Sequence, residues 1–146
     1  MESLTQRNNT IHTQSPQTLR ILDANLNRLR EGIRVVEDIL RYGFNHKDFA
    51  LSLKALRHQC KLTSYFELLN TRNSQKDVLK TSTKYEQTRK NLENIFIANF
   101  KRSQESARVL EEILKLQNIQ ESERFKEIRY TLYTLEKEIL TTLFAP

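Results

Sequence analysis

Cysteine, glycine and proline are scarce in this sequence of 146 residues. The single cysteine, Cys60, excludes an internal disulfide and a cysteine-cluster metal site, and its apolar surroundings predict a small buried side chain. Two glycines and two prolines are too few for a protein with many tight turns. Because strong helix formers dominate, the composition predicts an all-α protein, and the length suits one domain with a single core.

The sequence also lacks a hydrophobic run long enough to cross a bilayer and an N-terminal leader of the cationic-then-apolar kind. We therefore expect a soluble, cytoplasmic protein with no membrane partner. The net charge of +6 suits an anionic partner. However, acids lie three or four positions from most of the bases, and no aromatic residues interleave them, so the pattern does not favour nucleic acid.

Several common catalytic motifs are missing. No glycine-rich phosphate loop is present, which excludes nucleotide binding of the P-loop kind. The three histidines, His12, His46 and His58, lack metal-ligand spacing, and no Glu-x-x-His pair suggests a di-iron bundle. Neither a histidine metal site, nor a di-iron centre, nor a serine-histidine-aspartate triad is therefore predicted.

One stretch of the chain occurs twice. Residues 23–42 match residues 97–116 at a shift of 74 positions, and residues 53–58 match residues 125–130 more weakly at a shift of 72. The matched positions include Ala24 and Ala98, Asn25 and Asn99, Arg28 and Arg102, Glu31 and Glu105, Arg34 and Arg108, and Glu37 and Glu111. The repeat predicts a duplicated helical hairpin, in which the polar residues common to both copies are candidates for a shared site.

The predicted fold is an antiparallel four-helix bundle built from this tandem hairpin. Ser15 and Pro16 are typical of a helix start, Gly43 is expected to end the first helix in the left-handed conformation, and Asn45 to open the second. A flexible tail is predicted over 1–14 and a single helical domain over 15–146. Within the domain, the repeats cover about 16–70 and 87–143 and are joined by a loop over 71–86. The four helices are expected over about 16–42, 46–70, 85–117 and 122–143.

The first helix carries apolar residues on two sides. A heptad seam predicts core contact with the partner helices, and it consists of Leu22, Leu26, Leu29, Ile33, Val36 and Leu40. A second stripe places Arg28 and Glu31 among hydrophobic neighbours, while Asp23 and Glu37 are expected on the solvent face. A helix that is apolar on two sides belongs at the centre of its bundle, so the first and third helices are predicted to form the inner pair.

Two sets of polar residues repeat in steps of three: Asn25, Arg28, Glu31 and Arg34, and Asn99, Arg102, Glu105 and Arg108. Such spacing also suits ladders of surface ion pairs, which contribute only a few tenths of a kcal/mol each. Arginine and asparagine together offer donors to a phosphate or a ring edge, and a nearby glutamate could orient the arginine or act as a base. The residues alone leave both interpretations open.

These stretches resemble a known family. The two A-N-x-x-R-x-x-E-x-x-R blocks, L-R-H at 56–58, Arg72, Asp77-Val78 and I-R-Y-T-L-Y-T-L-E at 128–136 are similar to a helical domain often fused in front of thiamine-phosphate synthase. That domain is regarded as a hydroxymethylpyrimidine-phosphate kinase of a non-ribokinase type. Two positions depart from the family pattern: Leu29 stands where a small residue is usual, and Leu79 stands where glycine usually follows Asp-Val.

The resemblance implies a step of thiamine biosynthesis, the phosphorylation of a phosphorylated pyrimidine by ATP with Mg²⁺. By that resemblance, substrate would bind at Asn25, Arg28, Arg34, Asn99, Arg102 and Arg108, with Glu31 and Glu105 as candidate catalytic residues and Arg72, Lys76 and Asp77 covering the nucleotide. Two further hypotheses stay open, a non-catalytic partner of thiamine-phosphate synthase and an RNA-binding bundle. A homodimer is also compatible with the sequence.

Overall fold

The computed structural model describes residues 15–145, except for the side chain of Tyr85, and the predicted tail over 1–14 lies outside this range. The described chain is all-α and contains no strand. The helices are α2 (Pro16–Asp38), the π-helical turn η1 (Ile39–Gly43), α3 (Lys47–Gln59), α4 (Tyr65–Thr71), the 3-10 turn η2 (Ser74–Lys76), α5 (Lys84–Gln87), α6 (Leu92–Leu114), α7 (Ile119–Ile139) and the π-helical turn η3 (Leu140–Phe144). Within this range, no helix combines the length and the apolar character needed to cross a membrane.

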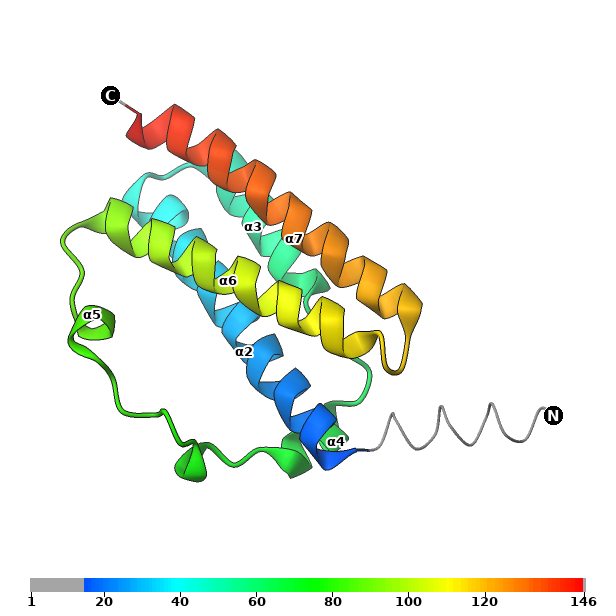
Figure 1. Ribbon diagram of the computed structural model, residues 1–146. Coiled ribbons are helices and arrows are strands. Elements are labelled where there is room, and N and C mark those ends of the chain that lie inside the picture. The colour runs from blue at the N-terminus through cyan, green and yellow to red at the C-terminus, as the bar shows by residue number, and fades with distance from the viewer. Residues whose placement is uncertain (1–14, 146) are drawn as a thin grey trace.

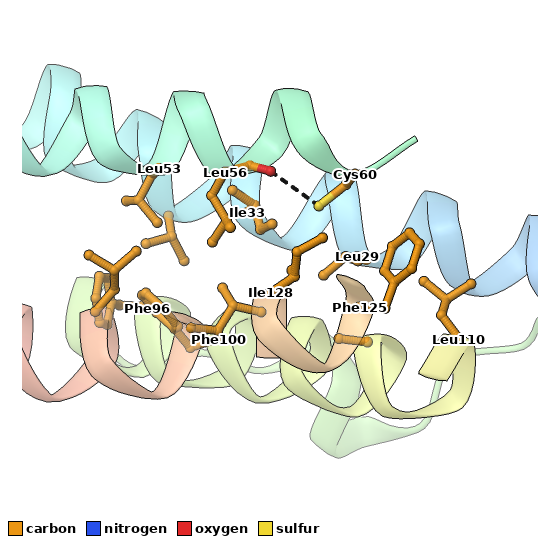
Figure 2. Close-up of a cluster of buried hydrophobic side chains, with 14 of the residues drawn as sticks. Leu29, Ile33, Leu53, Leu56, Cys60, Phe96, Phe100, Leu110, Phe125 and Ile128 are labelled. Carbon is orange, nitrogen blue, oxygen red and sulfur yellow. Dashed lines mark hydrogen bonds between the residues drawn. The ribbon is translucent and has the colours of Figure 1, made fainter. Parts of the chain in front are cut away.

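The core lies between α2, α3, α6 and α7. As expected from the apolar seams, α2 and α6 make the most extensive contact, α3 packs on α2, and α7 packs on α6. α2 and α6 run in opposite directions (Figure 1). The predicted seam of α2 is buried except at Leu26, which is partly buried, and it meets large side chains such as Phe96, Phe100 and Phe125 (Figure 2). The heptad pattern therefore identified the core correctly.

Cys60 is a buried core residue, as predicted. Its thiol donates a hydrogen bond to the carbonyl oxygen of Leu56 at 3.3 Å (Figure 2). Burial raises the pKa of the Cys60 thiol to about 12. Because the thiolate is the reactive form, this cysteine is poorly suited to nucleophilic chemistry near neutral pH.

The second predicted helix is broken, which corrects the expectation of one helix over 46–70. α3 ends at Gln59 and α4 begins at Tyr65. Arg124 of α7 fixes the break, because its guanidinium donates hydrogen bonds to the carbonyl oxygens of Gln59 and Lys61. As a consequence Phe66, which was expected inward, is 74 % exposed.

Helix boundaries differ from the predictions where side chains cap the backbone. Gly43 does not adopt a left-handed conformation; Asn45 does, with φ of 51°. His46, rather than Asn45, caps α3 by accepting a hydrogen bond from the amide of Phe49. α6 begins at Leu92 instead of residue 85, and α7 begins at Ile119 instead of residue 122, because asparagines at 91 and 118 act as N-caps there.

α2 and α6 cross at Gly32. A β-carbon at this position would clash with the hydroxyl of Ser103 and would lie 3.0 Å from the backbone oxygen of Asn99. The Ser103 hydroxyl donates a hydrogen bond to the carbonyl oxygen of Leu29 at 3.3 Å. Small side chains on both helices therefore allow a close approach of the two backbones.

We expect Gly32→Ala to lower the free energy of unfolding by about 1–3 kcal/mol, because the added methyl group overpacks the crossing and this outweighs the helix propensity of alanine. Gly43→Ala is the matched control, since a β-carbon there would stand at an ordinary 3.9 Å from Leu92. Urea denaturation of both variants measures the difference. Equal stability of the two variants would show that the helices do not approach as closely as described.

Candidate functional site

Four charged residues surround the crossing of α2 and α6. Arg28 and Glu31 directly precede the contact residues Leu29 and Gly32, and Arg102 directly precedes Ser103. Glu105 lies two positions after Ser103 on the same helix. The crossing therefore brings the central charged residues of the two repeated sets to one region of the α2–α6 pair.

The side chains of Arg28, Glu31, Arg102 and Glu105 are exposed, which corrects the prediction that Arg28 and Glu31 point among hydrophobic neighbours. The seam residues occupy the core side of each helix, so residues next to them in sequence are rotated about 100° toward solvent. Within the described part of the chain, none of the four makes an ion pair or a side-chain hydrogen bond. Their charges are thus available to a ligand.

The side chains of the two repeated asparagines make the same hydrogen bond, to the carbonyl group four residues earlier. The side-chain amide of Asn25 donates to the carbonyl oxygen of Ile21 at 2.9 Å, and that of Asn99 donates to the carbonyl oxygen of Ile95 at 2.8 Å. Asn25 is buried and Asn99 is half-buried. These bonds to the preceding turn hold both side chains in fixed positions close to their helices.

Two clefts flank this region, and the segment 72–89 borders both. The first cleft, of about 640 Å³, lies between α2 and the start of the segment and is lined by Arg28 and Glu31 together with Asp77. The second cleft, of about 490 Å³, lies between α6 and the end of the segment and is lined by Arg102 and Glu105. Figure 1 shows the segment running from α4 past α5 to the start of α6. Each cleft thus contains one arginine and one glutamate of the repeated sets.

Arg72 anchors the start of the segment to α2. Its Nε and one terminal nitrogen donate to the two carboxylate oxygens of Asp23, each at 2.8 Å. The hydrogen bond to Asp23 raises the pKa of Arg72. Asp23, which was expected on the solvent face, is only 6 % exposed. The repeat does not indicate this pair, because Ile97 stands at the position of the second copy that matches Asp23.

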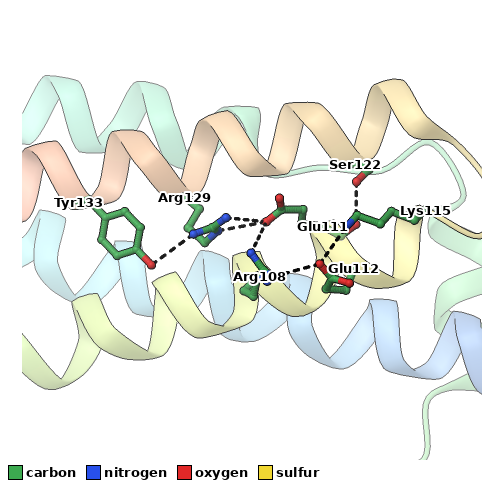
Figure 3. A network of polar contacts seen from close by, with 7 residues as sticks. All are labelled: Arg108, Glu111, Glu112, Lys115, Ser122, Arg129 and Tyr133. Carbon is green, nitrogen blue, oxygen red and sulfur yellow. Dashed lines mark hydrogen bonds and ion pairs between the residues drawn. The ribbon is translucent and has the colours of Figure 1, made fainter.

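Glu37, also expected on the solvent face, and its matched residue Glu111 both form buried ion pairs. Glu37 accepts from Arg57 Nε at 2.7 Å, and Glu111 accepts from Arg129 at 2.9 and 3.1 Å. The hydrogen bond to Glu37 raises the pKa of Arg57, and the bonds to Tyr133 and then to Glu111 raise the pKa of Arg129 (Figure 3). These matched residues therefore support the packing of each hairpin.

Besides Asn99, which lies at the crossing but lines neither cleft, three predicted site residues lie apart from both clefts. Arg34 pairs with Asp38 at 3.3 Å, and Arg108 pairs with Glu112 at 3.3 Å. Lys76 is exposed in η2 and lines neither cleft. The structure therefore separates these residues from the arginines at the crossing.

A metal ion in either cleft would need ligands besides the side chains of the described residues. Within residues 15–145, no group of three histidine, cysteine, aspartate or glutamate side chains could hold a metal on its own. Mg²⁺ bound with a nucleotide usually needs only one or two carboxylates, because phosphate oxygens and water supply the other ligands. Glu31 and Asp77 line the first cleft and suit that coordination.

The fold and these clefts define a class of protein. It is an all-helical domain with two clefts at a helix crossing, and each cleft contains an arginine and a glutamate of the repeated sets. A family model matches residues 20–138, and the chain belongs to the ThiD2 family. No solved structure matches the chain.

Curated relatives are named thiamine-phosphate synthase. The protein of Prochlorococcus marinus subsp. pastoris is 39% identical over 134 residues, covering 90% of this chain and 38% of the relative. The protein of Nostoc punctiforme is 38% identical over 122 residues, covering 83% and 35%, and that of Gloeobacter violaceus is 42% identical over 120 residues, covering 81% and 35%. The chain thus spans little more than a third of these relatives. It is a ThiD2 domain of the kind found in thiamine-phosphate synthase proteins, which relates it to thiamine biosynthesis.

Proposed function

We propose that the chain phosphorylates hydroxymethylpyrimidine phosphate with ATP in thiamine biosynthesis. The observation that carries the proposal is the presence of Arg28 and Arg102, without acidic partners among the described residues, in two clefts beside one helix crossing. Both clefts have the volume of small-molecule sites. Membership of the ThiD2 family and the names of the relatives support the thiamine pathway.

In this proposal Arg28 and Arg102 bind phosphate groups, for which a guanidinium offers two parallel donors. Asn25 and Asn99 contact the pyrimidine or a phosphate. Glu31 and Glu105 orient the arginines, and Glu31 with Asp77 would hold Mg²⁺, which neutralises charge on the phosphates when it is bound.

Arg72 covers the nucleotide indirectly, because its pairing with Asp23 holds the start of the segment 72–89 beside the first cleft. The reaction moves the terminal phosphoryl group of ATP to a phosphate oxygen of the substrate, giving ADP and a pyrimidine diphosphate. The protein's contribution is mainly to position the two substrates and to neutralise their charge.

We also propose that the domain arose by duplication of one helical hairpin. Two pairs of matched features support this: the asparagine hydrogen bonds at 25 and 99, and the ion pairs of Glu37 and Glu111 with arginines of the following helices.

A second candidate function is that of an accessory domain of thiamine-phosphate synthase. Large apolar side chains that are exposed to solvent favour the accessory function: Phe66 is 74 % exposed, Val78 93 % and Leu79 84 %. Such residues suit contact with another protein.

The test is to incubate the purified chain with ATP, Mg²⁺ and hydroxymethylpyrimidine phosphate and to follow the products by ³¹P NMR. We expect ADP and a pyrimidine diphosphate in equal amounts, with no ADP above the blank when the pyrimidine is omitted. A matched reaction includes the part of a related thiamine-phosphate synthase that lies outside the region this chain matches. Absence of transfer in both reactions would refute the kinase proposal, and binding of the synthase without transfer would favour the accessory function.

A further inference from the structure

A third pocket, of about 340 Å³, lies at the junction of η1 and α3. None of the residues that line it lines either cleft at the α2–α6 crossing. Its volume falls within the range of sites for small molecules. The proposed kinase reaction makes no use of this pocket.

Three cationic side chains line the pocket: Arg41 from η1, and Lys47 and Lys54 from α3. None of them makes an ion pair within the described part of the chain. The guanidinium of Arg41 lies over the ring of Tyr42, at 5.0 Å from its centre. Because the lysines are two helical turns apart, they lie on one face of α3 and project toward the same space.

Among the described residues, Glu37 is the only acidic one that lines the pocket, and its charge is already compensated. Its side chain is 1% exposed and accepts hydrogen bonds from two nitrogens of Arg57, at 2.7 and 3.3 Å. The pocket therefore carries an excess of positive charge. Ala50 and Leu51 lie between the two lysines in sequence and supply an apolar part of the lining.

His46 adds a fixed hydrogen-bond donor. Its Nδ1 accepts from the amide of Phe49 at 3.2 Å, and its ring stacks on the ring of Phe49 with centres 4.2 Å apart. In a neutral imidazole whose Nδ1 is an acceptor, Nε2 carries the proton. His46 lines the pocket, so this N–H is a donor held in place by stacking.

We propose that this pocket is a second anion site, which binds the phosphoryl groups of a small phosphorylated molecule. Arg41, Lys47 and Lys54 supply the charge, the His46 N–H supplies a directed hydrogen bond, and Ala50 and Leu51 contact the organic part of the molecule. Three positive charges suit a ligand with two or three negative charges, such as a diphosphate. Hydrogen bonds between charged groups are stronger than those between neutral groups. A nucleotide and an inorganic diphosphate share this chemistry.

The experiment is a titration of the full chain with inorganic pyrophosphate and, separately, with ATP, both without Mg²⁺, followed by amide chemical shifts and calorimetry. We expect shifts at Ala50 and Leu51. The double variant Lys47→Gln, Lys54→Gln should weaken pyrophosphate binding about 10-fold or more. The control Lys61→Gln, Lys126→Gln removes the same charge at two exposed positions outside the pocket and should leave the affinity within about two-fold.

Each outcome decides the proposal. Equal weakening in the lysine variant and in its control, or no weakening in either, would overturn it. Arg28→Gln, Arg102→Gln should keep the shifts at Ala50 and Leu51, so failure of the kinase proposal would leave this pocket unaffected. ATP binding more tightly than pyrophosphate would identify a nucleotide as the ligand, and equal affinity would identify the phosphoryl groups as the recognised part.

Discussion

Replacing Glu111 with alanine is expected to lower the free energy of unfolding by about 3–5 kcal/mol. Glu111 is 5 % exposed and receives two hydrogen bonds from Arg129, whose side chain is itself only 10 % exposed (Figure 3). Without the carboxylate, a guanidinium stays buried with its charge uncompensated. Urea denaturation followed by circular dichroism measures the loss.

Two further variants separate charge from packing. Glu112→Ala removes a neighbouring carboxylate that is 45 % exposed in its pairs with Arg108 and Lys115, so we expect a much smaller loss. Glu111→Leu, Arg129→Leu removes both charges and should recover most of the stability, because apolar residues often replace a buried ion pair at little cost. A double variant as unstable as Glu111→Ala would contradict the explanation by uncompensated charge.

The helical core could be predicted from the sequence because it depends on a local period. Apolar residues at alternating spacings of three and four lie on one side of a helix whatever its neighbours are. The buried positions of Leu22, Leu29 and Ile33 follow from this rule alone. The loop between the repeats was recognised for the opposite reason, since it lacks any such period.

The buried charges could not be predicted in the same way. A helical wheel assigns Asp23 and Glu37 to solvent because it contains no information on partners from distant segments. The partner of Asp23 is Arg72, and that of Glu37 is Arg57, and each arginine lies on another element. The repeat did match Glu37 with Glu111 and residue 57 with residue 129. The two matches together suggest one ion pair in each hairpin, between Glu37 and Arg57 and between Glu111 and Arg129. This signal could have revealed both ion pairs.

The break between α3 and α4 was missed for a related reason. Neither proline nor glycine occurs near residue 60, so no local signal ends the helix. The carbonyl groups freed at the break are satisfied by Arg124, which is far away in sequence. The exposure of Arg28 and Arg102 was not predictable either, because both residues are adjacent to seam residues and lie close to the boundary between core and solvent.

The double variant Arg28→Gln, Arg102→Gln is expected to weaken binding of hydroxymethylpyrimidine phosphate about 100-fold or more. Each arginine lines a cleft at the α2–α6 crossing and has no acidic partner among the described residues, so its charge is available to a phosphate. Both side chains are exposed, and glutamine is a good helix former, so the fold should be unchanged. Circular dichroism checks that the helical content is retained.

Isothermal titration calorimetry with hydroxymethylpyrimidine phosphate tests this account most directly. The matched control is Arg34→Gln, Arg108→Gln, which removes the same charge from the same two helices at residues that pair with acids outside both clefts. We predict that the control binds within about three-fold of the unmodified chain, while Arg28→Gln, Arg102→Gln shows no measurable heat. Equal affinities of the two double variants would contradict the assignment of the site to the α2–α6 crossing.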